Sequence, residues 1–113
     1  LDGMFLQTAM TCIEKNIDKI NYSVDDFSAD MQISYIQLNR KLEALTNQTP
    51  VQFIRSIRLK RAADLLCTSQ FNVNEIMLLV GFNDASYFSK MFKAEFGMTP
   101  KQYASKHKPG PKQ

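Results

Sequence analysis

Apolar residues recur at intervals of three and four positions along most of this chain, which is the spacing of helices that bury one face. The pattern predicts helices over residues 3–20, 24–31, 34–45, 50–68, 73–80, 84–96 and 100–103. Glycine and proline are scarce before the last five residues, which favours helices over a many-stranded sheet. We therefore expect an all-α protein with about seven helices.

The expected helix starts share a capping pattern, in which Ser, Thr or Asn is followed three positions later by a side chain that can bond back to the cap. The pattern occurs at Ser23–Asp26, Thr49–Gln52, Asn72–Glu75 and Thr99–Gln102. Both threonines precede a proline, which suits the first helical position. Gly81 and Gly97 are expected to end the helices that precede them.

Two segments of the chain repeat one pattern. Val24 and Phe27 match Val73 and Ile76 at an offset of 49 residues. At an offset of 50, Leu38, Leu42, Thr49, Pro50, Gln52 and Phe53 match Phe88, Phe92, Thr99, Pro100, Gln102 and Tyr103. Each copy predicts a helix, a tight turn, a second helix and a capped exit, which is a helix-turn-helix unit.

The turn inside each unit requires a residue that tolerates positive φ. Gly81 meets this requirement without steric cost. The first copy has Gln32 at the matching position, and we expect that residue to cost about 1 kcal/mol. Asn47 stands where Gly97 stands, and asparagine is the next best residue for a left-handed helix end.

The predicted organisation is two helix-turn-helix units joined by one long helix, in a homeodomain-like arrangement. Residues 1–48 hold an N-terminal helix and the first unit, 49–68 the linker helix, 69–105 the second unit and 106–113 a disordered basic tail. In DNA-binding units of this kind the second helix enters the major groove. A stiff linker would place two such helices in successive major grooves, about 34 Å apart on one face of the duplex.

Charge supports a polyanionic partner and the composition offers little for catalysis. Residues 1–48 hold four basic and seven acidic residues, whereas residues 49–113 hold ten and four. Cys12 and Cys67 lack a metal or redox spacing and are expected to be buried reduced thiols, and His107 is the single histidine. We therefore expect no enzyme activity, no metal and no cofactor.

The first residues lack the basic stretch of a signal peptide, and no apolar run approaches the roughly 18 residues of a membrane span. We therefore expect a cytoplasmic fragment that makes no membrane contact.

The segments "RLKRAADLL" and "VGFNDASYFSKMFKAEFGMTP", together with the paired units, resemble the DNA-binding domain of the AraC/XylS family of bacterial transcription regulators. The resemblance covers residues 22–103. The first unit is most similar to members fused to the C-terminus of hybrid two-component sensors of Bacteroides-type bacteria. The resemblance implies that a sensory or dimerisation domain precedes this chain in the full-length protein. It is also compatible with a parent protein that is anchored in the inner membrane. Gln32 and Met77 depart from the family, which usually has glycine and a small residue at these positions.

The resemblance implies sequence-specific binding of double-stranded DNA for transcription regulation, as expected of an activator. The residues that match base-reading positions are Ile36, Asn39, Arg40, Ala85, Ser86, Ser89 and Lys90. Phosphate contacts are expected from Ser34, Tyr35, Lys41, Asn83, Tyr87 and Lys93. Arginine reads guanine and asparagine reads adenine, whereas the small side chains of the second unit favour backbone anchoring.

Two alternatives stay open on the sequence alone. Basic residues of the linker helix either form structural ion pairs, such as Lys60 with Asp64 one turn away, or contact DNA; they are Arg55, Arg58, Lys60 and Arg61. The whole chain is also compatible with a helical interaction module that docks RNA polymerase or a partner regulator. Salt distinguishes the two functions, because DNA binding weakens steeply as salt rises.

Overall fold

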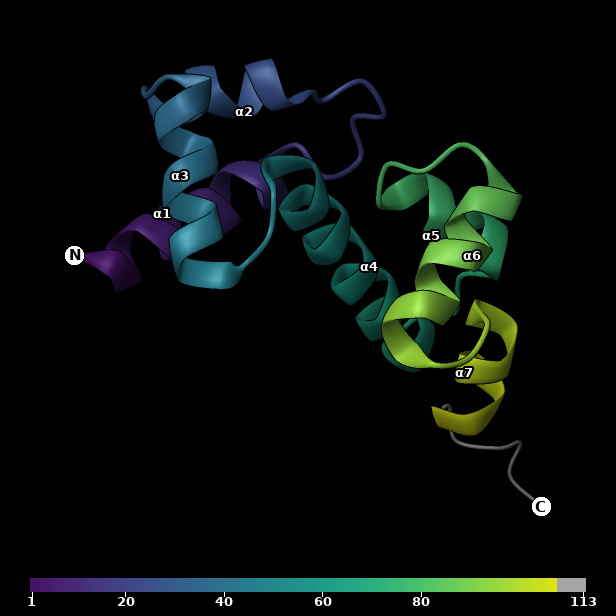
Figure 1. Cartoon of the computed structure of the whole chain (residues 1–113). Helices are drawn as coiled ribbons and strands as arrows, with labels where there is room; N and C mark the ends of the chain where they lie inside the picture. The colour runs from purple at the N-terminus through teal and green to yellow at the C-terminus, as the bar shows by residue number, and fades with distance from the viewer. Residues whose placement is uncertain (108–113) are drawn as a thin grey trace.

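A computed structural model describes residues 1–107, which form seven α-helices and no strands (Figure 1). The helices are α1 (Asp2–Lys15), α2 (Val24–Met31), α3 (Tyr35–Thr46), α4 (Pro50–Thr68), α5 (Val73–Leu79), α6 (Ala85–Phe96) and α7 (Pro100–His107). The expected all-α class is therefore confirmed. None of these helices is long and apolar enough to cross a membrane.

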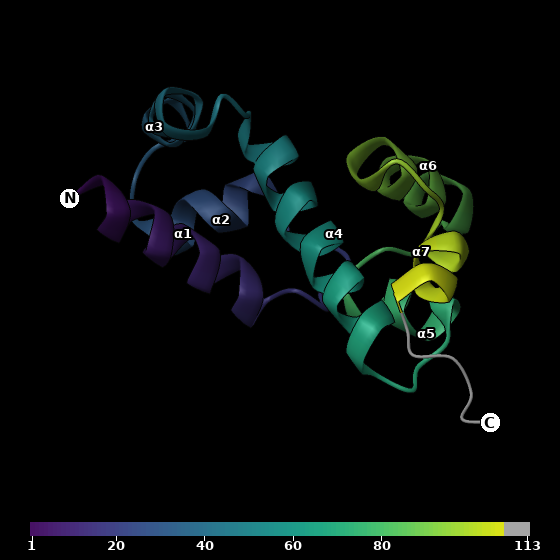
Figure 2. The same cartoon turned by 90° about the horizontal axis from the view of Figure 1, so that it is seen from below.

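Two hydrophobic cores lie on either side of the long helix α4 (Figures 1 and 2). The first core joins α1, α2 and α3 to the N-terminal half of α4 through Phe53, Ile54 and Ile57. The second joins α5 and α6 to the C-terminal half of α4 through residues that include Leu59 and Leu66. Because one continuous helix contributes to both cores, the two units form on a shared rigid element.

The predicted capping pattern is present at all four helix starts. At Thr49, for example, the hydroxyl accepts a hydrogen bond from the Gln52 amide at 3.2 Å, and the Gln52 side chain accepts from the Thr49 amide at 3.0 Å. Reciprocal pairs of the same kind occur at Ser23–Asp26, Asn72–Glu75 and Thr99–Gln102. Each pair satisfies backbone donors that a helix start leaves unpaired.

The repeat is confirmed in its turn geometry. Gln32 has φ 60° and Gly81 has φ 90°, and the amide of each donates to the carbonyl three residues earlier at 3.1 Å. Asn47 and Gly97, which end α3 and α6, have φ 59° and 81°. Gln32 therefore has the positive φ that the alignment of the two copies predicted, with the conformational strain that this implies for a residue other than glycine.

The helix predicted over residues 3–20 ends at Lys15, so the prediction was wrong for residues 16–20. The Asn16 side chain donates to the Cys12 carbonyl at 2.7 Å, and the chain turns there. Ile17 then packs against both hydrophobic cores. The helix therefore ends in a local turn at Asn16, and the next residue lies where the two units meet, although the apolar spacing continues to Ile20.

The remaining differences concern smaller stretches of the chain. The last helix was expected to end at Tyr103 but continues to His107, whose ring stacks on Tyr103 at 4.0 Å between centroids. Residues 108–113 of the predicted tail lie outside the described residues. Cys12 and Cys67 are free thiols, half-buried rather than fully buried.

Candidate nucleic-acid interface

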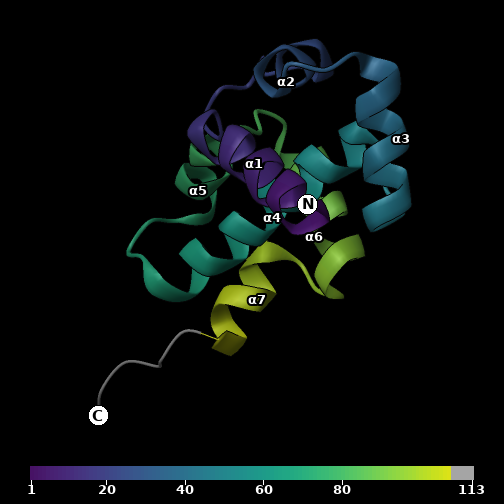
Figure 3. The same cartoon turned by 90° about the vertical axis from the view of Figure 1, so that its left-hand side faces the viewer.

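The two second helices of the repeat, α3 and α6, lie along the same side of the molecule. Figure 2 shows α3 close to end-on and α6 obliquely, both at the upper edge, with α4 passing between them. Figure 3 shows both on the opposite side of the molecule from α5. The helices predicted to enter DNA are thus neither divergent nor enclosed, and one surface presents both.

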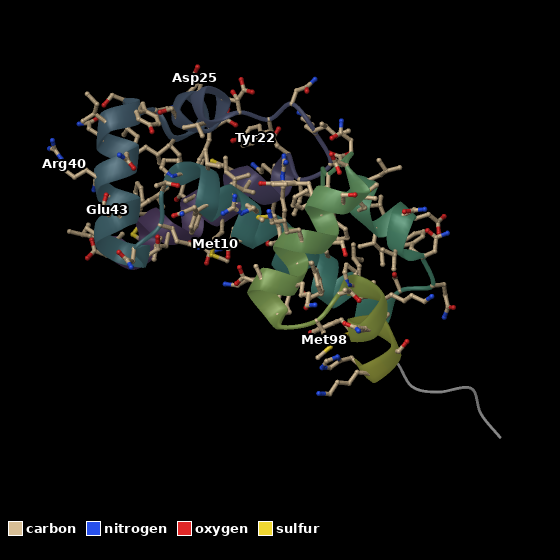
Figure 4. All side chains as sticks on the ribbon, turned by 45° about the vertical axis from the view of Figure 1, so that its right-hand side comes forward. Met10, Tyr22, Asp25, Arg40, Glu43 and Met98 are labelled. Carbon is tan, nitrogen blue, oxygen red and sulfur yellow. The ribbon has the colours of Figure 1, made fainter. Side chains whose placement is uncertain are left out.

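The outer face of α3 is built by its capped start and its buried stripe. The Ser34 hydroxyl accepts from the Gln37 amide at 3.2 Å, a cap that the sequence comparison did not single out. Leu38 and Leu42 are fully buried on the inner face. Ile36, 66% exposed, and Arg40 occupy the outer face, and Figure 4 shows Arg40 projecting away from the rest of the molecule.

The outer face of α6 is built in the same way. The Asp84 carboxylate accepts from the Tyr87 amide at 3.0 Å and so caps the helix. Phe88 and Phe92 are buried in the second core, which confirms the interpretation of the aromatic stripe as core. The exposed side chains of this helix include Ala85, Ser86, Lys90 and Lys93.

The two outer faces differ in charge at matching positions. Arg40 of α3 matches Lys90 of α6 at the offset of 50 residues, so both helices present a cation there. Three residues further on, α3 has the exposed Glu43 (Figure 4) and α6 has the exposed Lys93. At these two matching positions α6 therefore presents two cations, whereas α3 presents a cation and an anion.

Two of the predicted base-reading residues are half-buried. Ser89 lies on the flank of α6 and Asn39 on the flank of α3. The Asn39 side-chain oxygen is buried and has no hydrogen-bond partner among residues 1–107. A bidentate contact with adenine uses both the oxygen and the nitrogen of the amide. Asn39 would therefore have to rotate its side chain to read a base in that way.

The predicted phosphate-contacting residues are all exposed, and the side chains of three of them already have partners. The Lys41 ammonium lies 5.1 Å from the centre of the Phe5 ring of α1, a cation–π geometry. The Tyr87 hydroxyl accepts from Arg55 of α4 at 3.2 Å. The Ser34 hydroxyl caps α3, as described above, and the others are Tyr35, Asn83 and Lys93.

The basic residues of α4 divide into structural and surface groups. Arg61 forms an ion pair with Glu14 at 3.4 Å, and within residues 1–107 no ion pair joins Lys60 to Asp64. Arg58 is only 8% exposed, and its guanidinium donates to two backbone carbonyls. Burial lowers the pKa of Arg58 below its usual value, although an arginine stays charged at neutral pH.

A cavity of about 300 Å³ lies between the two units. It is lined by residues of α4 that include Arg55 and Arg58, by the 20–24 segment and by the turn before α6. Within residues 1–107, no group of three or more His, Cys, Asp or Glu side chains is placed to hold a metal ion.

Comparison with known proteins gives a consistent result. The family described as "Helix-turn-helix domain" matches residues 27–106. A histidine kinase, P4, of Formosa agariphila is 40% identical over 107 residues, and the virulence regulon transcriptional activator VirF of Shigella flexneri is 37% identical over 98. These matches cover 95% and 85% of this chain, but the chain spans only 8% and 36% of those two proteins.

A solved transcriptional regulator from Chromobacterium violaceum, with an AraC-type DNA-binding domain, superimposes with a TM-score of 0.84 at 28% identity. The match covers 96% of each chain.

Proposed function

Since the chain belongs to the AraC/XylS family of helix-turn-helix domains, we propose that it binds specific sites on double-stranded DNA and so regulates transcription. In this proposal α3 and α6 enter successive major grooves on one face of the duplex. The observation that carries it is that both helices lie along the same side of the molecule, with α4 between them and matching outer positions exposed.

In this proposal α3 and α6 have different roles in DNA recognition. Arg40 is the residue best placed to read guanine, and Ile36 offers an apolar surface to a thymine methyl group. Ala85 and Ser86 at the start of α6 are small and offer little to base edges. The main contribution of this helix is then the positive charge of Lys90 and Lys93. The second unit therefore supplies more affinity through phosphates and less discrimination between bases.

Selection of binding sites from random duplexes tests this proposal. We expect two short sequence blocks whose centres lie about 10 base pairs apart, with the stronger base preference in the block that α3 contacts. Binding should weaken steeply between about 50 and 200 mM salt, through release of counterions from the phosphates. A pool without enriched blocks, or binding that ignores salt, would contradict DNA recognition by this surface.

A second function, contact with a protein such as RNA polymerase, is supported by an exposed apolar pair on α5. Leu78 and Leu79 are 51% and 40% exposed, on the helix that Figure 3 shows opposite α3 and α6. Such a contact would let the domain act as an activator while bound to DNA. Replacement of both leucines by serine should then reduce transcription without reducing DNA affinity, and unchanged transcription would remove α5 from this role.

We further propose that the domain is the output part of a longer regulator with an N-terminal sensory or dimerisation region. The relatives support this proposal, because the chain matches only a small part of the Formosa histidine kinase. A hybrid two-component sensor would place the domain in the cytoplasm of a parent anchored in the inner membrane. Phosphorylation-dependent occupancy of the selected sites by the full-length protein would test this arrangement.

A further inference from the structure

Three chain segments that are far apart in sequence meet between the two units. They are residues 16–19 after α1, Arg58 in the middle of α4, and Gly81 in the turn of the second unit; we call this contact the junction. The Arg58 guanidinium donates to the Lys19 carbonyl at 2.7 Å and to the Gly81 carbonyl at 3.3 Å. One side chain of the linker helix therefore bonds to the backbone of both units.

The Arg58 contacts are unusual because they lack an acidic partner. Arg58 is 8% exposed, and its Nε atom has no hydrogen-bond partner among residues 1–107. The one ion pair among residues 1–107 joins Glu14 to Arg61, one turn further along α4, and leaves Arg58 without a carboxylate. A buried guanidinium without a carboxylate keeps a desolvation cost. The hydrogen bonds to the two carbonyls offset that cost. Because the guanidinium is planar and directs its N–H groups rigidly, these bonds fix the positions of both carbonyls relative to α4.

Gly81 brings the second unit unusually close to the first. A Cβ atom at this position would lie 2.5 Å from the Ile17 carbonyl oxygen and 2.8 Å from the Arg58 Cζ atom. Ile17 also packs against both hydrophobic cores. The turn before α6 thus rests directly on the backbone that leaves α1, with the guanidinium alongside.

We propose that Arg58 is a positioning residue that sets the aim of α6 relative to α3, and through this the spacing between the two DNA blocks that the protein accepts. The proposal rests on the proposed DNA binding. Because α6 begins four residues after Gly81, the orientation of its start follows the position of this turn. Arg55 adds a second contact one turn earlier on α4, through the Tyr87 hydroxyl.

The test compares the affinities of Arg58→Lys and Arg61→Met for duplexes that carry both selected blocks. In one duplex the two blocks have the selected spacing, and in two others the spacing is one base pair shorter or longer. Each change of one base pair rotates one block by about 35° relative to the other. Lysine keeps the charge at position 58, but a single ammonium does not reproduce the fork that spans two carbonyls. Arg61→Met is the control, because the ion pair of Arg61 with Glu14 joins α4 to the first unit and not to the second.

The ratio of affinities between the selected and the altered spacings is the deciding quantity, because partial unfolding lowers all affinities equally. Wild type and Arg61→Met should bind the selected spacing at least about tenfold more tightly than the altered spacings. This factor corresponds to the loss of one charge-assisted hydrogen bond when the units have to reorient. Arg58→Lys should reduce that preference to within about threefold. An unchanged ratio in Arg58→Lys, or an equal loss in Arg61→Met, would overturn the proposal. A wild-type protein that binds neither block would instead refute the proposed function.

Discussion

Replacing Gly81 by alanine should destabilise the protein far more than the same replacement at Gly97. Both glycines have positive φ, 90° and 81°, so alanine carries a similar backbone cost of about 1–2 kcal/mol at either position. They differ in their surroundings. A Cβ at Gly97 would have no atom within 4 Å, whereas at Gly81 it would collide with the Ile17 carbonyl and with Arg58.

The size of the difference follows from what must move at Gly81. The Ile17 oxygen is backbone and cannot rotate away, so the turn or the guanidinium shifts. Overpacking of a close contact costs about 1–3 kcal/mol, and a weakened hydrogen bond to a charged group costs a similar amount. We therefore expect a loss of at least about 3 kcal/mol for Gly81→Ala and about 1–2 kcal/mol for Gly97→Ala.

Urea unfolding followed by circular dichroism measures both changes on the same footing. The quantity compared is the free energy of unfolding extrapolated to water, with a check that the denaturant slope stays constant. Gly97→Ala is the internal control for the backbone conformation alone. Losses of equal size in the two variants would show that the approach of Gly81 to the first unit contributes nothing, and would undermine the junction as well.

Four further outcomes are expected. Gln32→Gly should raise the free energy of unfolding by about 1 kcal/mol, because it removes a strained φ of 60° from an exposed turn; a lower urea midpoint would count against that strain. Burial and the hydrogen bond to Asp30 raise the pKa of Tyr22, so the folded state holds this proton more tightly than the unfolded chain. The contribution of Tyr22 to stability should then be constant below pH about 10 and be lost above it, so that stability falls less steeply there in Tyr22→Phe. Arg40→Ala should cost about 1–3 kcal/mol on the selected site and relax base preference there, whereas an equal loss on random duplexes would exclude base reading. Lys93→Ala should weaken binding to all duplexes alike and lower the salt slope by about 1, and an unchanged slope would remove it from the phosphate contacts.

Local features of the chain predicted most of the fold. Helix starts follow from side chains three positions apart, and the reciprocal bonds of Thr49 with Gln52 show how little else is needed. The buried stripes follow from the helical period, as Phe88 and Phe92 illustrate. Both kinds of feature act within one or two turns of helix, which is why a single sequence reveals them.

The features that were missed depend on partners far away in the chain. Arg58 donates to carbonyls 39 and 23 residues away, and nothing in its neighbours distinguishes it from Arg55 or Arg61. The packing of the segment after α1 was likewise not predicted, because Ile17 contacts both hydrophobic cores. The same limit applies to the interface, where the sequence did not predict that Lys41, an expected phosphate contact, also lies over the Phe5 ring.

The repeat itself explains why one copy has glycine in its turn and the other does not. Gln32 adopts φ 60° with an intact turn hydrogen bond, so this turn does not by itself require glycine. Only the second copy places its turn against another unit, where a Cβ would meet the Ile17 carbonyl at 2.5 Å. Gly81 is therefore needed for the contact between the units more than for the turn. Gln32 faces solvent and costs only its own conformational strain.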